Sequence, residues 1–188
     1  MKNIVRVITV AVAIYAIPFA AIAEDSAKEP KTFRLIPILK REHGYGRMDS
    51  VVIRTKTEFD SFLAEVRRQR GWNNREWFVS AIINAKVNFG KEALVLLRHT
   101  EGSGSVQVTF HNPTFRARAR KLTCRITRME PKYGTCDMAY YCIALAVSNS
   151  AVSKVVLKVT DQKSLVLPIR EKQSNKVGYL LPPRQHLK

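Results

Sequence analysis

Three arginines alternate with alanines in the second half of the chain, at Arg116, Arg118 and Arg120. Alternate residues of an extended strand point to one side, so the three guanidinium groups would share a face. Guanidinium groups bind phosphates and carboxylates through paired hydrogen bonds. More basic residues follow closely: Lys121, Arg125 and Arg128. The cluster predicts an anion-binding patch, with charge protection of a sheet edge as the alternative.

The spacing of these arginines conflicts with that of the residues that follow. Leu122, Cys124 and Ile126 have the same parity as the arginines, and they are typical of a core. One unbroken strand would place charge and core on the same side of a sheet. A bulge or turn near residues 119–121 removes the conflict, so we expect the arginines on a loop or strand end.

The chain has three cysteines, which are Cys124, Cys136 and Cys142. Their spacing does not match a zinc knuckle and no histidine is close in sequence, so we expect no metal site. If the flanking strands form a hairpin centred on Tyr133, then Cys124 faces Cys142 and a disulfide joins them. Connectivity does not follow from sequence, so Cys124–Cys136 and Cys136–Cys142 remain alternatives.

Catalytic chemistry has little support in the residue pattern. The histidines are scattered along the chain, at His43, His99, His111 and His186. The segment Glu101-Gly102-Ser103-Gly104 lacks the G-x-S-x-G spacing of a nucleophile elbow. We therefore expect a protein that is not an enzyme and uses no cofactor.

Helical periodicity marks the N-terminal half, where Phe59, Phe62, Leu63 and Val66 lie on one helix face. We expect Thr57 to cap this helix, with Asp60 completing a variant of the capping box. A second helix is expected over residues 74–84, with Trp77 and Phe78 on its core-facing side.

Short apolar or alternating runs predict strands around and after the helix pair. They span residues 33–39, 50–54, 93–99, 105–111, 121–129, 141–147, 154–159 and 165–169. Pro37 predicts that the first strand lies at an edge. The run 141–147 is apolar on both faces and is therefore expected to be central. We predict an α+β fold over residues 32–170, with the two helices packed on a largely antiparallel sheet.

The first 23 residues have the three regions of a secretory signal peptide. Lys2 and Arg6 precede an apolar run that ends in Ala21-Ile22-Ala23. A membrane anchor is the alternative, but the run is shorter than the roughly 20 apolar residues of a spanning helix. Cleavage would leave a flexible leader at 24–31, the domain, and an extended tail at 171–188, with no transmembrane span. We expect a periplasmic or secreted protein.

The chain is strongly basic, with 32 Lys and Arg against 15 Asp and Glu and a net charge of +17. Loss of Lys2 and Arg6 with the signal peptide lowers this to +15. Such an excess favours anionic partners, including nucleic acid, lipid headgroups, anionic polymers and acidic proteins. The alternative is that the charge only keeps the protein soluble.

The run Val87-Asn88-Phe89-Gly90-Lys91-Glu92 leads into an apolar strand, a Gly102-Ser103-Gly104 turn and another strand. Later, Tyr140-Tyr141 precedes a closing apolar strand. Over residues 87–150 this order resembles the C-terminal domain of the protease-complex subunit PrcB family. The resemblance implies a module that stabilises another protein by binding it and that is not an enzyme. The chain departs from the family pattern at Asn88, where an Asp is usual, and lacks the proline before the tyrosine.

The sequence thus supports three hypotheses for function. The first is an exported, non-catalytic binding or stabilising module that associates with another envelope or secreted protein. The second is a basic protein that binds a polyanion such as lipopolysaccharide, nucleic acid or an anionic polymer through the arginine cluster. The third is an enzyme of unknown class, which predicts a pocket that holds a free cysteine or histidine beside a partner with a shifted pKa.

Overall fold

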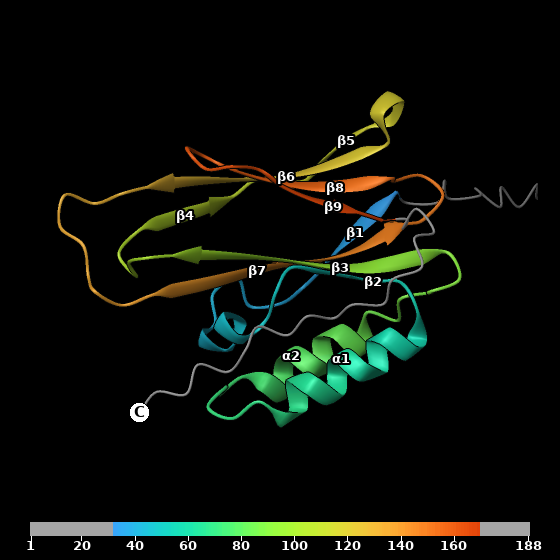
Figure 1. The fold of residues 1–188 in the computed structure, drawn as a ribbon, viewed down its shortest axis with the longest axis horizontal. Helices are drawn as coiled ribbons and strands as arrows, with labels where there is room; N and C mark the ends of the chain where they lie inside the picture. Colours follow the sequence, from blue (N-terminus) through green and yellow to red (C-terminus); the bar gives the residue numbers. More distant parts are fainter. Residues whose placement is uncertain (1–31, 170–188) are drawn as a thin grey trace, which may run out of the picture.

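Two β-sheets and a pair of helices make up the fold in the computed structural model, which describes residues 32–169 (Figure 1). The predicted signal peptide at 1–23, the leader at 24–31 and the tail at 171–188 lie outside the described residues. The α+β fold class is confirmed. The strands form two sheets, whereas the sequence pattern suggested one.

Sheet A has four strands in the order β1-β7-β3-β2, and every pairing is antiparallel. Its strands are β1 (Phe33–Ile36), β7 (Ala139–Ser148), β3 (Glu92–Glu101) and β2 (Val51–Ile53). The edge position of β1 and the central position of β7 are confirmed. Strand β1 ends immediately before Pro37, which has no backbone N–H to donate to a neighbouring strand.

Sheet B has five strands, ordered β4-β6-β8-β9, with β5 also paired to β6. They are β4 (Gln107–Phe110), β5 (Thr114–Arg116), β6 (Lys121–Met129), β8 (Lys154–Val159) and β9 (Leu165–Pro168). Strands β6 and β8 run parallel, and the other pairs are antiparallel.

The molecule has three layers, with sheet A between the helices and sheet B (Figure 1). Helices α1 (Lys56–Arg68) and α2 (Arg75–Asn84) cover one face of sheet A. Among the described residues, no helix is both long and apolar enough to span a bilayer.

Alternate residues of β7 contribute to two separate cores, as expected of a strand with both faces covered. Cys142, Ala144 and Ala146 pack in the core between sheet A and the helices. Leu145 and Val147 pack between the two sheets, in a core that includes Leu122, Val155 and Leu157.

Tyr45 and Trp72 anchor the helix-side core. Tyr45 lies in the 3-10 helix η1 (His43–Arg47) and donates a hydrogen bond from its buried hydroxyl to the carbonyl of Leu39, at 2.7 Å. Trp72 packs edge-on to Tyr45 and lies directly over Gly44, where a Cβ atom would stand 1.9 Å from the indole. Trp77 is 46% exposed, so the prediction that it faces the core is wrong.

The predicted cap of α1 is also wrong. The N-cap is Thr55, whose Oγ1 accepts a hydrogen bond from the backbone N–H of Glu58 at 3.1 Å. The Glu58 carboxylate in turn accepts from the N–H of Thr55 at 3.3 Å and completes the capping box. Thr57 lies within the first turn, because the helix begins two residues earlier than predicted, at the capping box that Thr55 and Glu58 form.

A turn follows β5 where the sequence required a break. Residues Ala117–Ala119 form the 3-10 helix η2, and Arg120 closes it with a φ of 44°. The turn shifts the chain so that Leu122 enters the inter-sheet core while Arg116 remains exposed. The predicted break at residues 119–121 is therefore confirmed.

Candidate anion-binding face

The outer face of sheet B is where the sequence-predicted basic residues gather. In β6, Leu122, Cys124 and Ile126 point into the inter-sheet core, so Lys121 and Arg125 point outward. In β8, Val155 and Leu157 point inward, and Lys154 and Lys158 are exposed. Phe115 of β5 packs toward the core, which turns Arg116 outward. We call Arg116, Lys121, Arg125, Lys154 and Lys158 the cationic face.

The strand register places these cations side by side in two rows. Arg116 pairs with Lys121 across β5 and β6, and Lys121 pairs with Lys154 across β6 and β8. Arg125 and Lys158 form a second pair four residues further along. Neighbouring strands lie only about 4.8 Å apart, and like charges directly opposite each other destabilise a sheet. The cationic face therefore holds repulsion that a bound anion would relieve.

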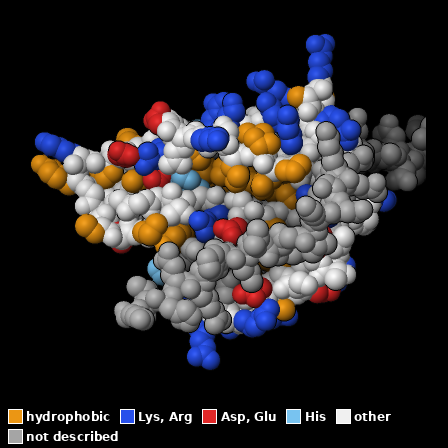
Figure 2. All heavy atoms as spheres, viewed as in Figure 1, with side chains coloured by type: hydrophobic (Ala, Val, Ile, Leu, Met, Phe, Trp, Pro, Cys, Tyr) orange, Lys and Arg blue, Asp and Glu red, His pale blue; other side chains and the backbone are white. Residues whose placement is uncertain are grey.

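No acidic side chain offsets this repulsion within the sheet. The five strands of sheet B contain no Asp and no Glu. Within residues 32–169, no ion pair involves any member of the cationic face. Figure 2 shows Lys and Arg side chains projecting from the upper side of the molecule, where Figure 1 places sheet B.

The structure divides the six residues of the predicted anion-binding patch into three groups. Arg116, Lys121 and Arg125 lie on the cationic face. Arg118 lies beside it, exposed on η2. The guanidinium groups of Arg120 and Arg128 bind partners within the protein and stabilise the fold.

Arg120 fastens the turn to the loop between β7 and β8. Its guanidinium donates to the carbonyl oxygens of Ser150 and Ala151. Its own carbonyl accepts from the N–H of Ser153 at 2.7 Å. These contacts hold the start of β8 against the start of β6, which sets the register of the cationic face.

Arg128 points inward and forms an ion pair between the two sheets. Its Nε and Nη2 donate to the two carboxylate oxygens of Glu101, at 3.0 and 2.8 Å. Glu101 lies at the end of β3 and is 1% exposed, and His99 Nε2 stands 2.6 Å from its Oε1. Burial opposes the charge of Glu101, but the hydrogen bonds from Arg128 and His99 outweigh it and lower the pKa of this carboxyl.

The predicted disulfide between Cys124 and Cys142 is contradicted. Strands β6 and β7 belong to different sheets and do not form a hairpin. Cys124 faces the inter-sheet core and Cys142 faces the helices, so sheet A separates the two thiols. Cys136 lies exposed in the β6–β7 loop, and all three cysteines are free. Burial raises the pKa of both Cys124 and Cys142 to about 12.

Sequence reasoning missed Lys154 and Lys158 as members of the face. Their spacing of four residues in a strand did place them on one side. The spacing did not predict which strand lies beside β8. Its neighbour is β6, which pairs with it in parallel although the whole of β7 separates the two strands in sequence.

Comparisons with known proteins add no family to this picture, because the chain matches no protein-family model, no curated protein and no solved structure. The resemblance of residues 87–150 to the PrcB family stays a prediction.

Proposed function

We propose that this chain is an exported, non-catalytic protein that binds a polyanion on the cationic face. The observation that supports this function is the acid-free sheet B, with like charges in register and without ion-pair partners among the described residues. A polymer that carries phosphate, sulfate or carboxylate groups would neutralise several of these cations at once. The periplasmic or secreted location rests on the N-terminal residue pattern.

Binding of this kind has a characteristic dependence on salt. Each cation that neutralises a phosphate of duplex DNA releases counterions, and log K falls with log salt by about 0.9 per contact. The face contains no Phe, Tyr or Trp, the side chains on which single-stranded bases stack. We therefore expect recognition of backbone charge without base sequence preference.

A charge-matched pair of triple variants tests the proposal. The face variant combines Arg116→Ser, Arg125→Ser and Lys158→Ser, and it leaves the structural Arg120 and Arg128 intact. The control combines Arg67→Ser, Lys91→Ser and Lys132→Ser, which removes equal charge from exposed sites elsewhere. With a duplex DNA oligonucleotide as the probe, the face variant should lose at least tenfold in affinity and about 2 to 3 in salt slope. Polyphosphate and phosphatidylglycerol vesicles, assayed in parallel, show whether a polymer or a membrane is the preferred source of phosphate.

The control variant decides whether position or charge alone matters. It should keep its affinity within about threefold. It should unfold at a urea concentration no higher than that of the face variant, because only the face variant removes like charges that lie opposite each other in the sheet. Equal losses in the two variants would show a nonspecific charge effect, and unchanged binding in the face variant would remove the cationic face as the site.

A further inference from the structure

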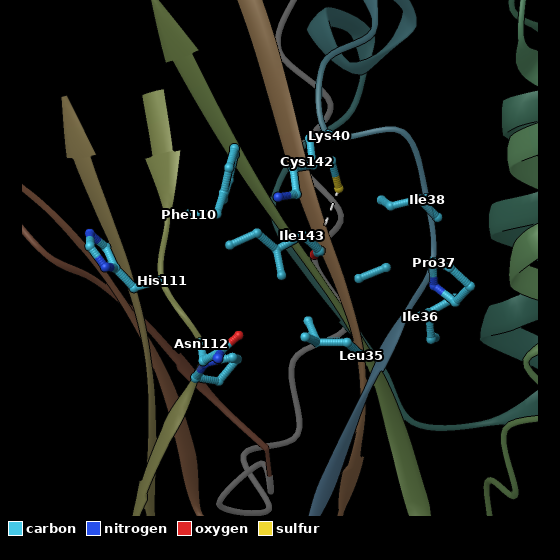
Figure 3. A pocket seen from close by; sticks show the side chains of 12 residues that line it. Leu35, Ile36, Pro37, Ile38, Lys40, Phe110, His111, Asn112, Cys142 and Ile143 are labelled. Atoms are coloured by element: carbon cyan, nitrogen blue, oxygen red, sulfur yellow. Dashed lines mark hydrogen bonds between the residues drawn. The ribbon is translucent and has the colours of Figure 1, made fainter. Parts of the chain in front are cut away.

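The two sheets do not close on each other along one side of the molecule. There, β1 at the edge of sheet A faces the β4–β5 segment at the edge of sheet B, and a cavity of about 200 Å³ lies between them (Figure 3). Figure 3 shows Leu35, Phe110 and Ile143 directed into this space, while His111 points away from it. Leu35 is 51% exposed although it lies on the core-facing side of β1. We call this space the edge groove.

The edge groove is mainly apolar, with Asn112 as a polar lining residue and one cation at its mouth. Its remaining lining comes from Ile36, Pro37, Ile38, Asn112, Pro113, Cys142 and Ala144, and it contains no carboxylate. The Nζ of Lys40 lies at the rim, 5.6 Å from the centre of the Phe110 ring. A ligand that matches both features has an alkyl portion and one negative charge.

Two prolines limit the length of strand edge beside the groove that could pair with an added peptide strand. Pro37 follows β1 directly, and Pro113 separates β4 from β5. Proline lacks the backbone N–H that a ladder of hydrogen bonds requires. An extended peptide could therefore pair only with the short edges of β1 and β4, whereas an apolar chain could use the whole wall of the groove as contact area.

We propose that the edge groove binds the alkyl chain of an anionic amphiphile, with Lys40 pairing the acidic headgroup. At about 200 Å³ the groove is smaller than the roughly 300–1,000 Å³ of sites that hold drug-sized ligands. It accommodates part of one unbranched chain and excludes bulky ring systems. Each methylene that enters the groove should raise the affinity about fourfold.

A chain-length series on the full mature chain tests the groove directly. Hexanoate, octanoate and decanoate are titrated below their micelle concentrations by calorimetry, and methyl NMR signals are followed in parallel. We expect affinity to rise by up to about sixteenfold for each added pair of methylenes and then to level off when the groove is full. The methyl signals of Leu35 and Ile143 should shift, and those of Leu63 in the helix-side core should not.

Two variants with matched controls locate the chain and the headgroup. Leu35→Trp places an indole in the groove and should lower decanoate affinity at least tenfold, whereas Leu165→Trp, at an exposed leucine of β9, should not. Lys40→Glu should lower decanoate affinity about fivefold and should favour decyltrimethylammonium in its place. Lys91→Glu, at an exposed lysine before β3, is the matched charge control.

The triple variant of the cationic face should bind decanoate like the wild type, which separates this inference from the proposed polyanion site.

Several outcomes would overturn the inference. No saturable decanoate binding by the wild-type protein would exclude the groove as a lipid site, and so would shifts confined to methyl groups outside it. Equal binding by Leu35→Trp and the wild type, with both folded by circular dichroism, would place the ligand elsewhere.

Discussion

At the scale of single residues, Glu101 is the buried carboxylate of the described part of the chain, and it depends on partners that offset the cost of burying its charge. It accepts a two-point contact from Arg128 and a further contact from His99. Because Glu101 belongs to sheet A and Arg128 to sheet B, their ion pair joins the two layers at one end of the inter-sheet core. A buried charge without its partner is strongly destabilising.

We predict that Glu101→Gln lowers the free energy of unfolding by about 3 kcal/mol at pH 7. The folded-state pKa of Glu101 is lowered, so its stabilisation is present above the unfolded-state pKa near 4.3 and is lost as pH falls through the folded-state value. The difference between the variant and the wild type should therefore shrink between pH 7 and pH 3. Urea unfolding at both values measures it.

Glu130→Gln is the matched control, because Glu130 contacts the same guanidinium at 2.7 Å but is 66% exposed. An exposed pair contributes about 0 to 1 kcal/mol, so this variant should stay close to the wild type at both pH values. Equal effects of the two substitutions would show that burial of Glu101 does not set the strength of the pair.

At the scale of elements, the capping box of α1 gives the sharpest distinction between sequence expectation and structure. We predict that Thr55→Ala lowers the free energy of unfolding by about 1 kcal/mol, because the backbone N–H of Glu58 loses the Thr55 hydroxyl as its acceptor. Thr57→Ala, at the residue that the sequence pattern favoured, should change it by less than about 0.5 kcal/mol. Thermal and urea unfolding of both variants decides between the two caps.

Local patterns predicted the elements well because their causes are local. The spacing of Phe59, Leu63 and Val66 is a property of one helix, and the parity conflict after Arg120 is a property of one strand. The correct cap could also have been predicted from the sequence, since Thr55-x-x-Glu58 matches the capping-box pattern better than Thr57-x-x-Asp60 does. The inward orientation of Arg128 could have been read from the parity it shares with Ile126.

Strand pairing between distant segments was beyond local patterns. Which strand lies beside β6 depends on burial and chain path across the whole domain, and one wrong hairpin altered two conclusions at once. It paired Cys124 with Cys142, which sheet A separates, and it left Lys154 and Lys158 out of the anion-binding site.

At the scale of the whole molecule, each of the two cores encloses one cysteine. We predict that the native protein has one rapidly reacting thiol, at Cys136, and that all three of its cysteines react after unfolding. Burial raises the pKa of Cys124 and Cys142 to about 12, which leaves almost no thiolate at neutral pH. Titration with a chromogenic disulfide reagent, with and without denaturant, measures both numbers.

Cys136→Ser should abolish the rapid phase and leave two thiols that react only on unfolding. A native protein with no titratable thiol, or a mass two hydrogens below that of the reduced chain, would show that a bridge does form and that the layers are arranged differently.

The position of β7 in sheet A has a consequence for synthesis of the protein. This strand lies between β1 and β3, yet it is encoded after residue 138 of a 188-residue chain. Until β7 has emerged from the ribosome, β3 lacks its long antiparallel neighbour. Both of the cores into which Leu94, Leu96 and Leu97 pack are then incomplete. Nascent chains with unpaired apolar strands are prone to aggregate, so this protein should depend on holding factors until β7 has emerged.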